Sequence, residues 1–221
     1  MTPDGPSFFL VAKNRVAERK HGAVAPPTDS VISGASWEGL DISGQAHANV
    51  LFVDVDLAEV RNEGAVFTEC TFRRARFNCS AHSSAAFVNC TFVNCNFFDT
   101  SFSDCKMVGS MFDRCSFDLM RVQGGNWSHV GLPGANLGSA TFADVRMREA
   151  DLTGARCEDG SLRDTDLAGA WLHSANLTGC DLRGSDLSAL DPTQTKVAGA
   201  IVTYQQALVI AQALGLDLRA E

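Results

Sequence analysis

A five-residue period runs through most of the chain and limits what the chain can fold into. Between Ile32 and Leu187, every residue whose number ends in 2 or 7 is apolar except His47, Asn62 and His82. The residues two positions earlier are mostly alanine, cysteine or serine. Neither an α-helix, with about 3.6 residues per turn, nor a flat strand, with a period of about 2, produces this pattern. A fixed short period kept over this length predicts a repeat architecture.

We interpret the period as a square coil in which five residues form each side. Each side would direct one large and one small residue inward and turn at its end, where Gly34, Gly44 and Asn94 tolerate unusual dihedrals. Four sides close a coil of about 20 residues, so the repeat makes about eight coils stacked at about 4.8 Å. Backbone groups would pair with the coils above and below. The expected fold class is therefore an all-β solenoid.

Three segments resemble a known family. Residues 150–154, 165–169 and 175–179 read Ala-Asp-Leu-Thr-Gly, Thr-Asp-Leu-Ala-Gly and Ala-Asn-Leu-Thr-Gly. They resemble the A-(D/N)-L-x-x units of pentapeptide-repeat proteins, which form right-handed quadrilateral β-helices. The resemblance covers residues 31–200 and implies this fold for them.

The C-terminal part resembles one subgroup of that family, the mycobacterial fluoroquinolone-resistance and Qnr-type proteins. The similar segments are Leu190–Pro192, Val197–Ala200, Gln205–Leu208 and Ala213–Leu216, together with Lys106–Phe112. Members of this subgroup bind DNA gyrase as dimeric mimics of duplex DNA. The resemblance therefore implies DNA gyrase as partner, a homodimer formed through the C-terminus, and protection against fluoroquinolones or a similar gyrase poison.

The repeat divides the chain into three parts. Residues 1–30 form an N-terminal extension and linker, residues 31–200 the pentapeptide-repeat β-helix, and residues 201–221 a C-terminal helix and tail. The extension falls outside the resemblance, and we expect it to be a disordered or capping tail. It lacks the basic start and apolar stretch of a signal peptide, and no apolar run is long enough to span a membrane. We expect a cytoplasmic protein without a membrane contact.

Acidic residues are concentrated in the repeat. Residues 31–200 contain 21 acidic and 13 basic residues, which give a net charge of −8. Such a surface repels nucleic acid and attracts basic clefts. Duplex DNA carries about one charge per 1.7 Å of its axis. The acids alone approach this density with about one per 1.8 Å of rod, whereas the net charge gives about one per 5 Å. Mimicry of DNA therefore requires the acids to be separated from the bases.

With one coil every 20 residues, many acids fall into two columns along the rod, and arginines gather near a third corner. The predicted acidic DNA-mimic surface comprises Asp99, Asp104, Asp118, Asp144, Glu158, Asp159, Asp164, Asp166 and Asp186. The basic corner comprises Arg73, Arg74, Arg76, Arg114 and Arg156. A competing interpretation is that the repeat places Asp or Asn before its central leucine in any case, and that acidic surfaces also serve solubility.

The sequence offers little for catalysis or metal binding. Seven of the eight cysteines occupy inward positions and only Cys79 points outward, so we expect reduced thiols that serve packing. No CxxC or HExxH motif is present. Asn62 and His82 lie 20 residues apart and are expected to form a buried hydrogen-bonded pair. We expect no cofactor, no metal site and no enzymatic activity, because no nucleophile accompanies the inward histidine.

The C-terminal residues predict a cap and an interface. Thr203 to Gln206 has the form of a capping box opening a helix that runs to about Leu214 and stops at Gly215. Leu208 and Leu214 are expected to cover the open end of the solenoid. The surplus of apolar residues predicts a symmetric dimer contact. The predicted interface comprises Ile201, Val202, Leu208, Val209, Leu216 and Leu218.

These features predict a non-enzymatic, dimeric rod that binds DNA gyrase in place of DNA and does not bind nucleic acid itself. The alternative is a structural or adaptor rod whose exposed faces bind an unrelated protein. Two acidic edges that continue through a C-terminal dimer would favour mimicry. A basic face or a monomer would favour the adaptor.

Overall fold

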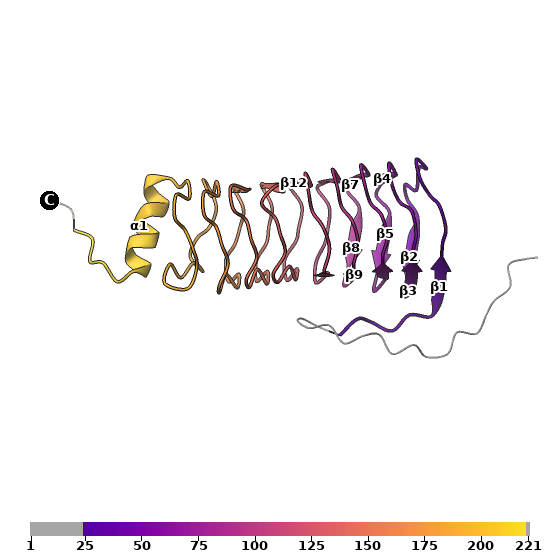
Figure 1. The fold of residues 1–221 in the computed structure, drawn as a ribbon, viewed down its shortest axis with the longest axis horizontal. Coiled ribbons are helices and arrows are strands. Elements are labelled where there is room, and N and C mark those ends of the chain that lie inside the picture. Colours follow the sequence, from indigo (N-terminus) through magenta and orange to yellow (C-terminus); the bar gives the residue numbers. More distant parts are fainter. Residues whose placement is uncertain (1–23, 220–221) are drawn as a thin grey trace, which may run out of the picture.

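A four-sided coil is stacked into a rod that ends in a helix, as the computed structural model shows for residues 24–219 (Figure 1). The first face carries β1 (Ser30–Ser33), β3 (Val50–Val53), β6 (Thr71–Arg73), β9 (Thr91–Val93) and β11 (Met111–Asp113). The third face carries β4 (Arg61–Glu63), β7 (Ala81–Ser83), β10 (Ser101–Ser103), β12 (Arg121–Gln123), β13 (Thr141–Ala143) and β14 (Ser161–Arg163). The fourth face carries β2 (Ala46–Ala48), β5 (Val66–Thr68) and β8 (Ala86–Val88). The second face is held by isolated bridges such as Asp56↔Arg76.

All pairings are parallel and join residues 20 positions apart. The register begins with Ser30↔Val50 and continues to Asp181↔Ile201 without a slip. Each inward side chain therefore lies directly above its equivalent in the preceding coil. The predicted right-handed quadrilateral β-helix is confirmed.

The corners need a backbone conformation that most residues avoid. Nearly all residues with positive φ have numbers ending in 4 or 9, at the ends of the sides. Glycine tolerates this left-handed region best, and Asn and Asp tolerate it better than other residues with a side chain. The corners of this rod are therefore positions where Asp is acceptable to the fold.

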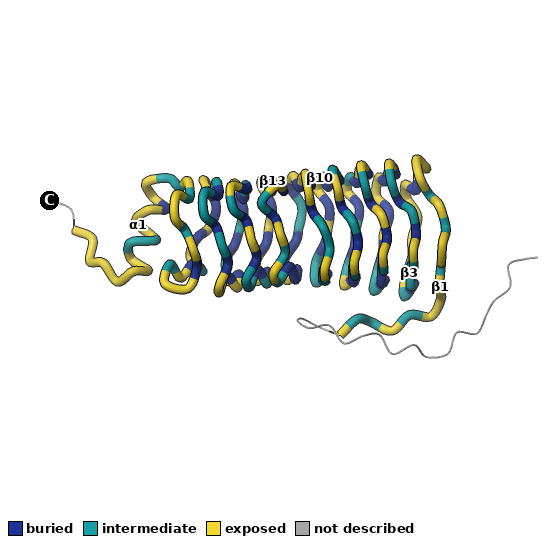
Figure 2. Tube along the Cα trace, viewed as in Figure 1, coloured by how far each residue is buried: buried dark blue, intermediate teal, exposed yellow. Residues whose placement is uncertain are grey.

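Stacked rings fill the N-terminal part of the core. Phe52, Phe72, Phe92 and Phe112 lie above one another on the first face, with ring centroids 4.6, 5.0 and 4.7 Å apart. Each such pair contributes about 0.5–1.5 kcal/mol beyond the burial of its area. Figure 2 shows that the buried residues line the inside of the coil along the rod. Packing of this kind gives a stiff, straight scaffold for the outer faces.

The cysteines belong to this packing. All eight are free, and Cys79 is the exposed one. Buried thiols donate to backbone carbonyls, as Cys90 Sγ does to Phe67 O at 3.4 Å. Burial raises the pKa of Cys105 to about 11 and that of Cys180 to about 12, so both stay protonated.

The buried polar pair is confirmed and extends to a third residue. Asn62 Nδ2 donates to His82 Nδ1 at 3.0 Å, and His82 Nε2 lies 2.9 Å from Ser80 Oγ. Ser80 Oγ in turn donates to Phe77 O at 2.6 Å. Because Asn62 donates to Nδ1, the proton of the neutral imidazole belongs on Nε2, where Ser80 accepts it. Burial lowers the pKa of His82 to about 3, so the ring is uncharged in the folded protein.

His82 should make the fold sensitive to moderate acid. The folded pKa of about 3 lies below the ordinary value of 6.5, so the unfolded chain binds the proton first as the pH falls. The contribution of His82 to the free energy of unfolding is therefore fully present above pH 6.5 and is lost progressively as the pH falls toward 3. At about pH 4.5 we expect a loss of about 3 kcal/mol in the free energy of unfolding. Urea denaturation at a series of pH values measures it.

A matched variant isolates this effect. Asn62→Leu/His82→Phe replaces the polar pair with apolar groups and should lose little stability between pH 7 and pH 4.5. Carboxylates whose pKa is lowered by arginine, such as Asp54 and Asp181, titrate below their ordinary value of 3.8 and thus in a lower window. An equal loss in both proteins would show that His82 is not the cause.

The C-terminal helix caps the rod differently from the expectation. Helix α1 (Tyr204–Ala213) begins at the N-cap Thr203 with the predicted capping box, and Gly215 follows its end with φ +81°. However, Leu208 and Leu214 are exposed rather than covering the last coil. The buried residue is Gln206, whose Nε2 donates to Leu182 O at 2.6 Å and to Ser185 O at 2.8 Å. An amide caps this end because no further coil follows to donate to the carbonyls of the last coil, and leucine has no donor to offer them.

Residues 24–29 of the predicted extension run beside the first face, while residues 1–23 lie outside the described part of the chain (Figure 1). No helix among the described residues is long and apolar enough to cross a membrane.

Candidate partner-binding surface

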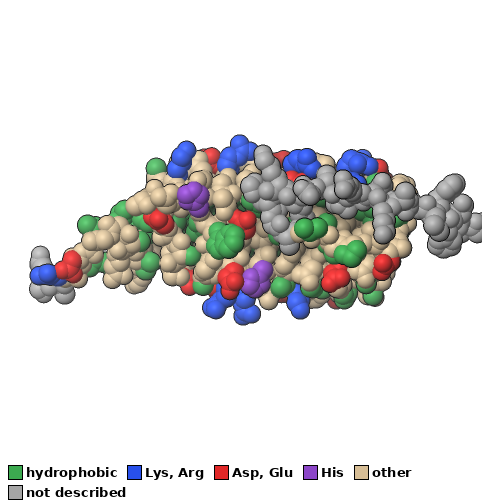
Figure 3. Space-filling model, turned by 90° about the horizontal axis from the view of Figure 1, so that it is seen from below, with side chains coloured by type: hydrophobic (Ala, Val, Ile, Leu, Met, Phe, Trp, Pro, Cys, Tyr) green, Lys and Arg blue, Asp and Glu red, His purple; other side chains and the backbone are tan. Residues whose placement is uncertain are grey.

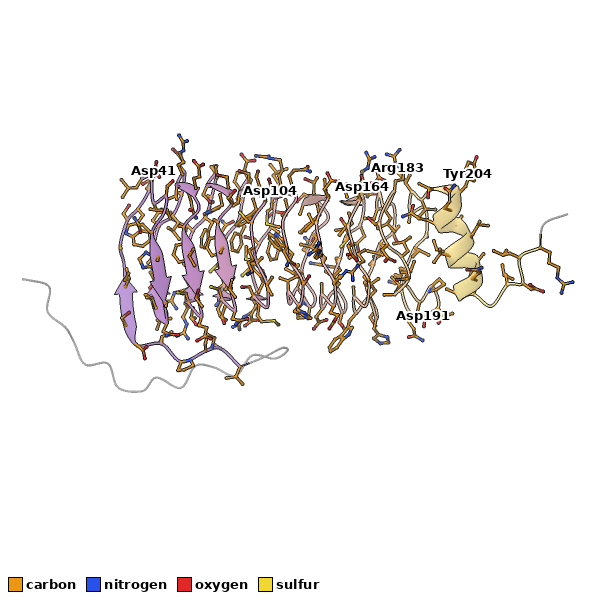
Figure 4. The ribbon with its side chains drawn as sticks, turned by 180° about the vertical axis from the view of Figure 1, so that it is seen from behind. Asp41, Asp104, Asp164, Arg183, Asp191 and Tyr204 are labelled. Carbon is orange, nitrogen blue, oxygen red and sulfur yellow. The ribbon has the colours of Figure 1, made fainter. Side chains whose placement is uncertain are left out.

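The predicted acidic residues flank the third face on both sides. Edge A, at the corner between the second and third faces, contains Asp99, Asp118, Glu158 and Asp159. Edge B, at the corner between the third and fourth faces, contains Asp104, Asp144, Asp164, Asp166 and Asp186. Figure 4 shows Asp104 and Asp164 along one long side of the rod and Asp191 on the opposite side. One face is thus bordered by two rows of carboxylates.

Five of these aspartates occupy the corner position itself. Their φ values are +54° at Asp99, +51° at Asp104, +55° at Asp144, +56° at Asp159 and +50° at Asp164. The left-handed conformation holds each Cβ at the rim of the rod. The fold therefore fixes where these carboxylates stand.

Three of the corner carboxylates lie over a glycine of the next coil. Asp104 lies over Gly124, Asp159 over Gly179 and Asp164 over Gly184, and a Cβ atom on any of these glycines would overlap the carboxylate oxygen. These aspartates form no ion pair with any described residue. Their charges remain available to a partner.

Other members of the two edges have partners within the rod. Arg121 Nη1 pairs with Asp99 Oδ1 at 2.7 Å, and Arg148 Nε pairs with Asp166 Oδ2 at 2.5 Å.

The remaining contacts come from uncharged groups. Gln123 Nε2 donates to Asp144 at 2.7 Å, Asn176 Nδ2 to Glu158 at 2.5 Å and Ser139 Oγ to Asp118 at 3.3 Å. Hydrogen bonds from Ser188 lower the pKa of Asp186. Amide and hydroxyl donors orient a carboxylate without supplying a positive charge.

Two cations interrupt edge B. Lys106 and Arg146 share the column of Asp166 and Asp186, through the bridges Lys106↔Asn126, Asn126↔Arg146 and Arg146↔Asp166. Sequence reasoning missed them because it grouped the acids alone, although the same 20-residue count identifies both. Edge B is therefore acidic at its corner and mixed on the fourth face.

The third face between the edges is mixed in charge. Small outward side chains occupy part of it: Ala81, Ser83, Ser101, Ser103, Thr141, Ala143 and Ser161. Four arginines lie on it as well: Arg61, Arg121, Arg163 and Arg183. Arg163 and Arg183 both approach Asp181, at 3.8 and 2.7 Å. The hydrogen bond from Arg183 is the main cause of the lowered pKa of Asp181. Two of the four arginines thus pair with Asp181 on the face itself, whereas Arg121 pairs with Asp99 of edge A.

The basic corner is also partly compensated. Arg74 Nε pairs with Asp54 Oδ1 at 2.7 Å, and Arg76 pairs with Asp56 of the preceding coil. The hydrogen bond from Arg74 lowers the pKa of Asp54. This corner lies between the first and second faces, away from edge B.

An apolar groove lies between α1 and the last coil. It has a volume of about 360 Å³ and is lined by residues that include Leu182, Val197, Val202 and Leu216. Of the predicted interface, Ile201, Leu208, Val209, Leu216 and Leu218 are exposed, whereas Val202 packs half-buried against the core. Exposed apolar residues thus surround an open groove at this end of the rod.

No metal-binding constellation accompanies these surfaces in residues 24–219: no group of three His, Cys, Asp or Glu side chains there is placed to hold an ion.

Two family models match the sequence. A model of the pentapeptide repeat region matches residues 65–142, and a model of eight pentapeptide repeats matches residues 132–169 and 150–188. Together they cover more than half of the chain. The chain belongs to the pentapeptide-repeat family.

Solved structures of other family members share the fold. One is a trypsin-treated variant of QnrB1, a plasmid-mediated fluoroquinolone resistance protein, with a TM-score of 0.64 and 20% identity over 88% of this chain and 97% of that chain. Another is HetL of the cyanobacterium Nostoc sp. strain PCC 7120, which is involved in the regulation of heterocyst differentiation. It has a TM-score of 0.54 and 17% identity over 79% of this chain and 84% of that chain. No curated protein matches the sequence.

Proposed function

We propose that this pentapeptide-repeat protein is a DNA mimic that binds DNA gyrase, inhibits or modulates it, and protects it from fluoroquinolones or a similar poison. The observation that carries the proposal is the pair of carboxylate rows on edges A and B, on either side of the third face. The fold that the chain shares with QnrB1, a fluoroquinolone resistance protein, also supports this proposal. The protein would act without catalysis or cofactor, in the cytoplasm with its partner, and would not bind nucleic acid itself.

Aspartates stacked on neighbouring coils repel one another, which indicates that edge B serves to bind a partner rather than to stabilise the fold. Asp144 and Asp164 occupy the same corner of adjacent coils, about 4.8 Å apart. Like charges placed directly opposite one another destabilise a sheet. Glycine would satisfy the same corner without repulsion, as Gly124 does one coil earlier. A basic partner cleft that accepts both charges explains why they are tolerated.

A dimer through the C-terminal end would complete the mimic. The exposed apolar residues beside the groove suit a second copy related by a twofold axis, since such an interface is self-complementary. The two rods would then meet end to end and present edges about twice as long. A duplex bound across a dimeric enzyme has this kind of symmetry.

Gyrase supercoiling tests the proposal directly. The protein is titrated into the reaction with and without a fluoroquinolone, at low and high salt. We expect inhibition or drug rescue at micromolar protein that weakens as salt increases, because the contact is electrostatic. The absence of any effect on supercoiling and on drug sensitivity would contradict the proposal.

An adaptor rod for an unrelated protein is the second candidate. It is favoured by Lys106 and Arg146, which interrupt edge B, and by the regulatory role of HetL within the same fold. An adaptor would leave gyrase unaffected, so the supercoiling assay separates the two functions.

A further inference from the structure

Trp171 is an exposed aromatic side chain on the first face, the side of the rod opposite the third face. It is 64% exposed, whereas Trp127 is completely buried in the core. The bridge Asp151↔Trp171 places Asp151 in the preceding coil, and Asp191 lies in the following coil, on the wall of the same hollow as Trp171. A hollow of about 280 Å³ adjoins the indole and is lined by residues that include His173, Asp191 and Gln194.

The two carboxylates beside Trp171 have no cationic partner among residues 24–219. Asp151 Oδ1 accepts the N–H of Thr153 at 3.0 Å, and Asp191 Oδ1 accepts that of Thr193 at 2.9 Å. Neither forms an ion pair with a described lysine or arginine. An exposed indole with a carboxylate on each side matches the chemistry of an arginine or lysine side chain.

The same face is already covered nearer the N-terminal end. Residues 24–29 run along the rod below it, and Asp29 N donates to Asn49 O at 2.7 Å (Figure 1). Thr71 and Thr91 face outward there, yet they are 1% and 0% exposed, and their hydroxyl oxygens lack a hydrogen-bond partner. The equivalent outward residue of the third face, Thr141, is exposed. An extended segment thus lies beside the first face at its N-terminal end, where outward hydroxyls are buried.

The residues that precede this segment carry the complementary charge. Lys13, Arg15, Arg19 and Lys20 lie within eleven residues of Val24. The coil of Trp171 is four coils beyond that of Thr91, or about 19 Å at the strand spacing. About six extended residues span this distance. Figure 3 shows the rod from below: outside the part covered by grey atoms, lysine and arginine side chains lie along the two long edges and acidic groups lie between them.

We propose that the basic segment of residues 13–20 binds in cis along the first face and places a cationic side chain on the indole of Trp171, between Asp151 and Asp191. This placement keeps a basic segment away from edges A and B, which lie on the opposite side. A free basic segment would otherwise compete for the acidic edges of its own rod.

Limited trypsin digestion of the full-length protein tests the proposal, because trypsin cuts after the four basic residues of the segment. We expect Trp171→Ala and Asp151→Asn/Asp191→Asn to speed these cuts at least tenfold, as followed by mass spectrometry. High salt should speed them in the unmodified protein. The control Asp144→Asn/Asp164→Asn removes the same charge from edge B and should leave the cutting rate unchanged.

A reciprocal experiment measures the solvent accessibility of Trp171 after the basic segment is changed. Arg15→Glu/Arg19→Glu should increase the acrylamide quenching of the fluorescence component that Trp171→Phe removes. Equal cutting rates in all variants would overturn the proposal, as would unchanged quenching. Faster cutting in the edge B control would instead place the segment on the acidic edge and overturn it as well.

Discussion

Replacing Asp104, Asp144 and Asp164 together with asparagine is expected to weaken the inhibition of gyrase about 100-fold. Asparagine tolerates the left-handed corner nearly as well as aspartate, so the three φ values near +50° to +55° can be kept and only charge is lost. An exposed ion pair with a partner contributes about 1 kcal/mol. Three lost pairs then amount to about 3 kcal/mol, or roughly 100-fold in affinity. Titration of the variant into the supercoiling assay measures the change.

The matched control removes three charges at corners outside edges A and B. Asp54→Asn/Glu69→Gln/Glu149→Gln also alters left-handed corners, and it should leave the inhibition within about twofold. The edge variant should in addition show a weaker salt dependence, because three of the nine edge carboxylates are lost. If both triple variants weaken inhibition equally, net charge rather than the edges accounts for binding.

The fold could be predicted from the sequence because the five-residue period determines both the core residues and the register between coils. The inward residues of each side fix the core, and a one-residue slip at Phe92 would turn its ring outward. The 20-residue register follows from four equal sides, and Ser30↔Val50 and Asp181↔Ile201 obey it alike. The same count of 20 residues per coil predicts that Asp104 and Asp164 lie on one edge, as they do.

Contacts between long side chains could not be predicted in this way. The pairing of Arg121 with Asp99, 22 residues away, depends on side-chain reach and rotamers rather than on the column of either residue. The prediction of the capping residues was wrong for a related reason. Helical periodicity favoured Leu208 and Leu214, whereas Gln206 is the residue that donates to the carbonyls of the last coil. Which side chain hydrogen-bonds to the backbone at the end of the solenoid depends on contacts outside the repeat, and the five-residue period does not predict them.

The exposed position of Trp171 could have been predicted from the sequence. Its number ends in 1, an outward position, where a large aromatic residue is unusual in a repeat that buries most of its rings. The inward positions, which predict the core, carry no information about it. Departures from a repeat at its outward positions are thus where recognition sites should be sought.

Introducing charge at the C-terminal end is expected to abolish the proposed dimer. Leu208→Asp/Leu216→Asp places two carboxylates per protomer beside the apolar groove, on side chains that are exposed in the single chain. The folded protomer should therefore be unaffected. In a dimer these charges would be buried without partners, at a cost of at least about 4 kcal/mol, or roughly 1,000-fold in the dissociation constant.

Sedimentation velocity measures the result. The unmodified protein should sediment as a dimer, at twice the chain mass of 23.6 kDa, and the variant as a monomer with an unchanged circular dichroism spectrum. The control Leu40→Asp/Val66→Asp adds the same charge to similarly exposed residues at the other end of the rod and should remain dimeric.

The monomeric variant should also inhibit gyrase at least tenfold less, because one rod presents only half the length of the acidic edges. A protein that sediments as a monomer before any substitution would leave the apolar groove to another partner and favour the adaptor function, since the mimic needs both halves.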